Sequence, residues 1–211
     1  MRPQQVREIE VKLHVADLCA MRRTLARLGA KAHGRVFESN TLYDTSDSRL
    51  RKSGRLIRLR VETQTTARTT TCPTRAGASS RAVLTYKAPI AEPGKLRSTR
   101  RYKEREEIEV ELANGANLGR ILECLGMRPG FRYEKYRTKY TLKNLPGLVL
   151  DLDETPAGIF LELEGPRRQI DRAARLLGYT KSDYDCRSYW DLHQEFCQRH
   201  KISAPHMVFD T

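Results

Sequence analysis

Two short stretches near opposite ends of the chain carry carboxylates at alternating positions. Glu8 and Glu10 precede Lys12 in the first stretch, and Glu162 and Glu164 form the second. Successive side chains of a β-strand point to opposite sides, so residues two apart share one face. Carboxylates grouped in this way can hold a hard cation such as Mg²⁺ or Mn²⁺, which also contacts phosphate oxygens. The spacing therefore suggests metal-assisted binding of a phosphate group.

Basic residues alternate in the same manner elsewhere in the chain. The candidate phosphate-binding residues all lie on the charged face of an alternating stretch, and they are Lys12, Arg58, Arg60, Lys87, Arg105, Lys135 and Arg137. Arginine can bind phosphate oxygens in a bidentate manner, whereas lysine acts as a point charge. Because the sequence lacks a glycine-rich phosphate loop, we expect side chains to make these contacts.

The overall charge agrees with an anionic ligand. Lys and Arg number 39 against 26 Asp and Glu, which gives a formal net charge of +13. Such an excess predicts nucleic acid, a membrane surface or a phosphorylated small molecule as partner. The sequence shows no aromatic-basic platform for nucleic acid and no apolar stretch long enough to span a bilayer. We therefore expect a small phosphorylated molecule, with nucleic acid and membrane disfavoured.

The charged residues belong to segments in which polar and apolar residues alternate, as β-strands with one apolar face do. Eight such strands are predicted, at residues 7–13, 35–43, 56–62, 83–87, 102–112, 133–142, 148–153 and 159–164. Amphipathic helices are expected between or after them, and these helices need an apolar surface to cover. If the apolar strand faces meet the helices, the charged faces line the inside of a closed barrel.

The chain also repeats itself. The stretch from Glu8 to Leu13 is echoed by the stretch from Glu107 to Leu112, and each is followed by a short helix and another strand. Such an internal repeat suits one pseudo-symmetric barrel. The predicted fold is α+β: an eight-stranded antiparallel β-barrel with pseudo-repeated β-α-β halves and helices packed outside. We expect a single domain over residues 1–200, a flexible loop insertion at 63–82, and a frayed tail at 201–211.

The order of these motifs resembles the CYTH family, the triphosphate tunnel metalloenzymes. Glu8-x-Glu10-x-Lys12 is similar to the E-x-E-x-K signature of that family. The motifs that follow it in the family's order are Tyr43-Asp44-Thr45, Arg58-x-Arg60, Lys87, Arg105 with its following glutamates, Lys135-x-Arg137, Leu152-Asp153-Glu154, Glu162-x-Glu164 and the helix around residues 188–192. The resemblance implies an eight-stranded tunnel that binds a triphosphate.

The resemblance also implies residue roles. The metal ligands for Mg²⁺ or Mn²⁺ would be Glu8, Glu10, Glu162 and Glu164, with Asp153 assisting. The triphosphate would be held by the seven basic residues given above, and the residues closest to the chemistry would be Glu8, Glu10, Lys12, Lys87 and Arg137. Glu107 and Glu109 would form a structural or secondary metal pair. Asp151 and Lys139 are in register with this lining.

The family implies an enzyme, and hydrolysis of a triphosphate-containing substrate is the first expectation. The substrate would be inorganic tripolyphosphate, a nucleoside triphosphate or thiamine triphosphate. Conversion of ATP to cyclic AMP and pyrophosphate, the reaction of class IV adenylyl cyclases, is the alternative. A module that binds polyphosphate or nucleotide without turnover is the alternative of another class. Five cysteines without a paired spacing favour a cytoplasmic protein, and the resemblance allows a homodimer.

Overall fold

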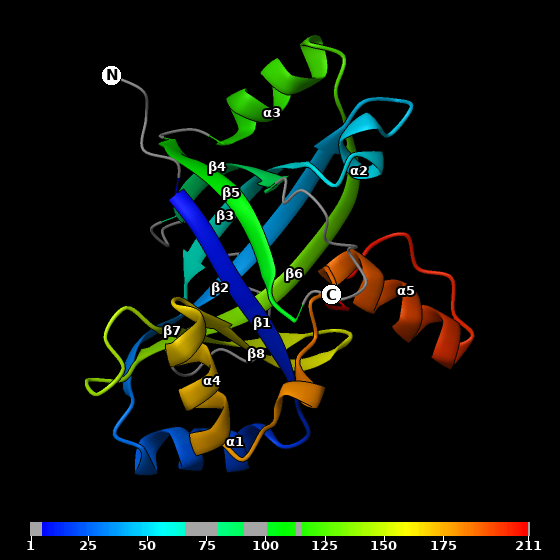
Figure 1. Ribbon diagram of the computed structural model, residues 1–211. Coiled ribbons are helices and arrows are strands. Elements are labelled where there is room, and N and C mark those ends of the chain that lie inside the picture. Colours follow the sequence, from blue (N-terminus) through cyan, green and yellow to red (C-terminus); the bar gives the residue numbers. More distant parts are fainter. Residues whose placement is uncertain (1–5, 66–79, 91–100, 113–114, 211) are drawn as a thin grey trace, which may run out of the picture.

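Eight strands form a closed antiparallel barrel in the computed structural model, which describes residues 6–65, 80–90, 101–112 and 115–210 (Figure 1). The order around the barrel is β1-β5-β4-β3-β2-β6-β7-β8, and β8 pairs again with β1. The strands are β1 (Val6–Val15), β2 (Lys31–Asp44), β3 (Leu56–Gln64), β4 (Ser80–Pro89), β5 (Lys103–Leu112), β6 (Arg128–Thr141), β7 (Val149–Thr155) and β8 (Gly158–Glu164). The predicted eight-stranded barrel is confirmed.

The observed strands differ most from the predicted ones in the lengths of β2 and β6 and in the strand ends that border the expected loop at 63–82. β2 and β6 are each 14 residues long and pair with one another over most of their length. The loop expected at 63–82 is shorter than predicted, because Thr63 pairs with Ser80 and Val61 with Ala82 in the ladder between β3 and β4. The small side chains of this segment concealed its strand ends, and its centre, residues 66–79, lies outside the described residues.

The helices occupy the outside and one end of the barrel. They are α1 (Leu18–Arg27), α2 (Arg49–Lys52), α3 (Gly115–Cys124), α4 (Arg167–Leu176), the short 3₁₀ helix η2 (Lys181–Asp183) and α5 (Tyr189–His200). The successions β1-α1-β2 and β5-α3-β6 reproduce the predicted repeat. Within the described part of the chain, no helix combines the length and the apolar character that crossing a membrane requires.

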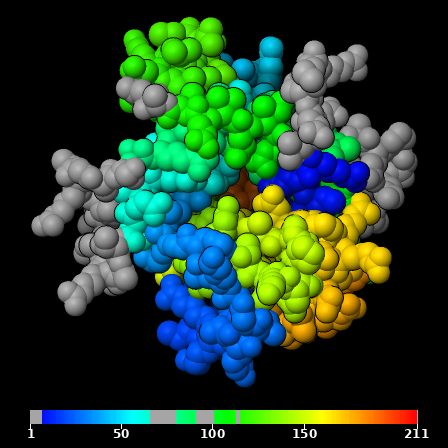
Figure 2. Space-filling view, turned by 90° about the vertical axis from the view of Figure 1, so that its left-hand side faces the viewer, coloured from blue at the N-terminus to red at the C-terminus, as the bar shows by residue number. Residues whose placement is uncertain are grey.

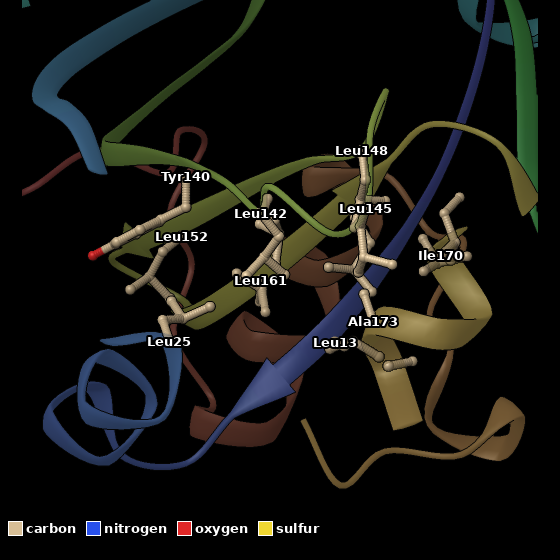
Figure 3. Close-up of a cluster of buried hydrophobic side chains, with 14 of the residues drawn as sticks. Leu13, Leu25, Tyr140, Leu142, Leu145, Leu148, Leu152, Leu161, Ile170 and Ala173 are labelled. Atoms are coloured by element: carbon tan, nitrogen blue, oxygen red, sulfur yellow. The ribbon is translucent and has the colours of Figure 1, made fainter. Parts of the chain in front are cut away.

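The main hydrophobic core lies outside the barrel wall. Val11 and Leu13 of β1 are fully buried and pack with residues of β6, β7 and β8 beneath α1 and α4. Figure 3 shows Leu13 together with Leu25 of α1 and Ile170 of α4. Since adjacent side chains of β1 alternate, this packing directs Glu8, Glu10 and Lys12 to the barrel interior.

A smaller core lies under α3 on the other half of the barrel. Leu122 of α3 packs with Tyr43 of β2 and Leu59 of β3. Gly119 permits this close approach, since a Cβ atom there would lie 2.8 Å from the Tyr43 hydroxyl oxygen. The apolar residue Leu59 thus faces the helix, and its neighbours Arg58 and Arg60 face inward.

Helix α5 packs across part of one end of the barrel. The Tyr189 ring stacks on Tyr133 with centroids 5.4 Å apart and meets Phe160 edge to face at 5.8 Å. Figure 2 views the opposite end, where a hollow between strands opens, and its floor shows the orange-brown of the chain near α5. The barrel interior is therefore a tunnel that is open at one end and partly covered by α5 at the other.

The C-terminal segment corrects the expectation of a frayed tail at 201–211. Met207 is 1% exposed. Its backbone N–H donates to the Arg132 carbonyl at 3.0 Å, and its carbonyl accepts from the Glu134 N–H at 2.8 Å. These contacts cover a part of β6 that precedes its pairing with β7, which begins at Tyr136. The barrel wall provides backbone partners that the sequence of the tail alone does not reveal.

Replacing Met207 with alanine is expected to lower the free energy of unfolding by about 2–5 kcal/mol, because a fully buried side chain would be removed from a packed site. Ile202→Ala is the matched control, since Ile202 belongs to the same tail but is 49% exposed. Its effect should stay within about 0.5 kcal/mol. Denaturant titration of both variants tests this prediction, and equal effects would contradict the structural role of the tail.

Candidate functional site

The tunnel interior gathers the predicted site residues. The strand registers place Arg105 opposite Glu8, Glu162 opposite both Lys12 and Asp151, and Arg137 opposite Asp153. Each of these residues shares the inward face of its strand with the other candidates. Lys12, Lys135 and Asp153 are at most 1% exposed. A dense set of charges inside a barrel requires that each charge be paired or bind a ligand.

Three carboxylates come together inside the tunnel. Glu8 of β1, Glu107 of β5 and Glu164 of β8 place one oxygen each within 4.8 Å of one another. The second oxygen of Glu8, Oε2, is buried and has no hydrogen-bond partner among the described residues. Carboxylate oxygens are the ligands that Mg²⁺ and Mn²⁺ prefer. The donor set and the unpartnered oxygen therefore fit a hard divalent cation.

The other predicted metal ligands lie outside this group of three. Glu10 and Glu162 both contact Lys12 Nζ, at 3.1 and 3.2 Å. Asp153 lies deeper in the tunnel, where it accepts hydrogen bonds from Lys135 Nζ at 2.8 Å and from the Tyr189 hydroxyl at 2.5 Å. We call Glu8, Glu107 and Glu164 the acid group. Of the predicted metal ligands, Glu8 and Glu164 belong to it, whereas Glu10, Glu162 and Asp153 lie beside Lys12 or Lys135.

Two members of the acid group, Glu164 and Glu107, retain protons more strongly than ordinary carboxylates. Burial, followed by the nearby charge of Glu8, raises the pKa of Glu164 to about 8. Burial also raises the pKa of Glu107, despite the adjacent Lys87. For Glu10 the opposite holds: the charges of Lys103 and Lys12 outweigh burial and hold its pKa well below its usual range. A cation bound to the acid group would replace the proton on Glu164.

The raised pKa of Glu164 predicts how stability depends on pH. Between its ordinary value of 4.5 and about 8, the unfolded chain releases this proton and the folded protein keeps it. Rising pH therefore favours unfolding across this window, with a slope of at most about 1.4 kcal/mol per pH unit. Without metal, the wild type should lose stability relative to Glu164→Gln between pH 5 and 8 in thermal or denaturant unfolding. Parallel profiles for the two proteins would contradict this assignment.

Most of the basic residues deep in the tunnel contact more than one carboxylate. Arg137 makes ion pairs with Asp151 at 2.8 Å and Asp153 at 2.6 Å, and it also pairs with Glu162. Lys87 Nζ lies 2.5 Å from Glu8 and 3.0 Å from Glu107. Further pairs in the same interior are Lys12 with Glu10 and Glu162, Lys135 with Asp153 and Glu38, and Arg58 with Glu109. The carboxylates hold these cations in place inside the tunnel.

Several interior residues escaped the sequence prediction. Glu38 is 1% exposed and pairs with Arg60 at 3.1 Å, and Asn40 accepts a hydrogen bond from the same guanidinium at 2.9 Å. Lys103 Nζ donates to Glu10 at 2.5 Å, and burial lowers the pKa of this lysine to about 8. Glu38 and Asn40 alternate along a predicted strand, and Lys103 lies two residues before Arg105. The alternation could have revealed all three.

Comparisons with known proteins agree with this geometry. The model of the CYTH domain family matches residues 6–189. The similar proteins include three of interest whose names contain the words "putative adenylate cyclase" or "putative adenylyl cyclase". The one from Methanocaldococcus jannaschii is 24% identical over 170 residues, which cover 81% of this chain and 83% of the relative.

The other two are solved structures. The structure from Vibrio parahaemolyticus has a TM-score of 0.70 and 17% identity. The match covers 90% of this chain and 99% of the Vibrio chain. The structure from Hippeastrum has a TM-score of 0.55 and 20% identity, covers 94% and 98% of the two chains, and is described as revealing a dominant triphosphatase activity. These structures share the fold of this protein. The family match over most of the chain, together with the charged tunnel, shows that this chain belongs to the CYTH domain family.

Proposed function

We propose that this protein hydrolyses a triphosphate-containing substrate inside its tunnel with the help of Mg²⁺ or Mn²⁺. The observation that carries the proposal is the presence of two complementary charge sets in one closed interior. The acid group of Glu8, Glu107 and Glu164 suits a cation. Lys12, Lys135 and Arg137 line the same interior and suit the negative oxygens of a polyphosphate chain. Phosphoryl transfer depends mainly on positioning and on neutralising charge, and both charge sets serve these ends.

The ion pairs inside the tunnel bear on how ligand and metal would bind. A triphosphate must compete with carboxylates for Lys12, Lys87 and Arg137, since all three are already paired. The displaced carboxylates would become unpaired buried charges unless a cation neutralised them. The bound metal would supply Lewis-acid polarisation of a phosphoryl oxygen. We therefore infer that metal and triphosphate bind cooperatively, with the side chains exchanging partners.

A substrate panel with product analysis tests the proposal. Tripolyphosphate, ATP and thiamine triphosphate are incubated with the protein and Mg²⁺, Mn²⁺ or a chelator, and free phosphate, pyrophosphate, ADP and cyclic AMP are measured. Metal-dependent release of phosphate is expected. Calorimetry should show that tripolyphosphate binds at least about tenfold more weakly with chelator than with metal. Absence of turnover with either metal would overturn the catalytic proposal.

Cyclisation of ATP is the second candidate, and the names of the similar proteins favour it. The Hippeastrum protein is described as a putative adenylyl cyclase that reveals a dominant triphosphatase activity. The same tunnel could hold ATP for attack by its own ribose hydroxyl at the α-phosphate. Cyclic AMP and pyrophosphate as the main products would favour this candidate. Tight, metal-dependent binding of triphosphate without any product would indicate a binding module.

A further inference from the structure

A second cavity lies beside α5, at the end of the tunnel that this helix partly covers. It has a volume of about 650 Å³ and is formed by α2, the start of α5 and the ends of strands β2 to β6. Lys103 and Arg105 line this cleft, and Lys103 also bonds to Glu10 inside the tunnel. The cleft therefore lies next to the tunnel interior, with Lys103 bordering both.

The walls of the cleft provide an aromatic platform. Trp190 of α5 is half-buried and packs edge to face against Phe131 of β6, with ring centroids 4.9 Å apart. The Arg51 guanidinium lies over the Trp190 ring, 5.4 Å from its centroid. Leu42 and Leu56 are half-buried apolar side chains that also line the cleft. Planar heteroaromatic rings stack on such surfaces, and every nucleobase has a face that can do so.

The charge of the cleft limits the ring that it can accept. Five basic residues line it, namely Arg51, Arg55, Lys103, Arg105 and Arg187, together with three acids. All three acids have other partners. Asp44 accepts from backbone N–H groups of α2, Asp191 caps α5, and Glu104 is paired with Arg7 and Arg167. Lys103 and Arg187 are likewise paired, with Glu10 and Asp185. Arg51, Arg55 and Arg105 add further positive charge to the lining, which favours a neutral base over a cationic ring such as a thiazolium.

The open end of the tunnel differs from this cleft. The strand registers place Glu62 opposite Arg81 and Lys139 opposite Asp151 near that end, and Arg81 pairs with Glu111 at 2.5 Å. These described side chains are charged and give a base no stacking surface. The two ends thus differ in chemistry: one is suited to ions, and the other to a neutral ring attached to phosphates.

We propose that the cleft beside α5 binds the neutral base of a nucleoside triphosphate whose phosphates enter the tunnel, and that Trp190 is a specificity-determining residue. This inference rests on the proposed function, because it takes the tunnel as the triphosphate site. It adds to that function a substrate class, a nucleoside triphosphate in preference to inorganic tripolyphosphate or thiamine triphosphate. It also assigns an orientation, with the base at the α5 end.

The test compares Trp190→Ala with wild type on ATP and on tripolyphosphate, which has no base. The ratio of kcat/KM for ATP to that for tripolyphosphate should fall about 5- to 150-fold, which corresponds to the loss of one base–aromatic stack. Trp190→Phe should restore most of the ratio, because it keeps a ring at that position. An unchanged ratio in Trp190→Ala would overturn the inference, and so would a wild-type preference for thiamine triphosphate over ATP.

Phe196→Ala provides the matched control. Phe196 is an aromatic residue of α5 that packs on His200 and does not line the cleft. Its removal should leave the substrate ratio unchanged, so a similar fall in both variants would attribute the effect to helix packing and overturn the role of Trp190. If wild type turns over neither substrate, the proposed function fails. Calorimetric binding of ATP and tripolyphosphate, measured with Mg²⁺ in wild type and Trp190→Ala, then decides the base site independently.

Discussion

Glutamine in place of Glu8 is expected to reduce metal-dependent phosphate release by roughly 100-fold or more, while the barrel remains folded. Even residues that only support metal ligands typically contribute 10- to 100-fold to affinity or activity. Glu8 belongs to the acid group and has one buried oxygen without a hydrogen-bond partner among the described residues. Its other oxygen lies 2.5 Å from Lys87. Glutamine has nearly the same shape but lacks the charge that attracts a cation.

Glu111→Gln is the matched control for this variant. Glu111 lies on the same face of β5 as Glu107, but its side chain is 70% exposed and pairs with Arg81. The control should keep its activity and its affinity for Mn²⁺, measured by calorimetry, close to those of wild type. Circular dichroism establishes that both variants are folded. Retention of metal affinity by Glu8→Gln would contradict the assignment of the cation to the acid group.

The barrel could be predicted because its alternation follows from one physical requirement. Val11 and Leu13 must be buried, and a strand that buries them turns Glu10 and Lys12 to the other side. Eight segments have this pattern, and the amphipathic helices that join them cover the apolar strand faces from outside. The charged faces must therefore line the interior. The same reasoning placed Arg58, Lys135 and Glu162 inside, as the strand registers show.

The grouping of acids could not be predicted from alternation alone. Alternation fixes the face of each residue, but the stagger of strands around a closed barrel decides which residues meet. Glu107 is next to Glu8 and Glu164 because β1 pairs with β5 on one side and β8 on the other. Asp153, by contrast, is drawn to Tyr189 of a helix more than thirty residues later in the chain.

The sequence also did not predict that α5 and the C-terminal tail pack against the barrel, for a similar reason. Tyr189 contacts Tyr133 and Phe160, and Met207 bonds to β6. These contacts join segments far apart in the chain. Periodicity describes how a segment presents its own faces, and it gives no information about an end of the barrel that another segment must close. The cleft with Trp190 arises from this same long-range packing.

Methionine in place of Arg137 is expected to lower the free energy of unfolding by about 3–5 kcal/mol, because it removes the shared partner of several buried acids. Asp151, Asp153 and Glu162 all contact this guanidinium. Arg81→Met is the control, since the pair of Arg81 and Glu111 is largely exposed and should contribute less than about 1 kcal/mol. Denaturant unfolding without metal or triphosphate measures both variants.

Combining Arg137→Met with Asp151→Asn separates a buried ion pair from simple loss of packing. Burial already raises the pKa of Asp151, and Arg137 is the ion-pair partner that opposes this rise at 2.8 Å. Once the arginine is removed, asparagine should be tolerated better than aspartate. The double variant should therefore be more stable than the sum of the single effects predicts, by about 0.5–3 kcal/mol. Strict additivity would contradict a stabilising ion pair between Arg137 and Asp151, and would leave Asp153 and Glu162 as the partners that stabilise Arg137.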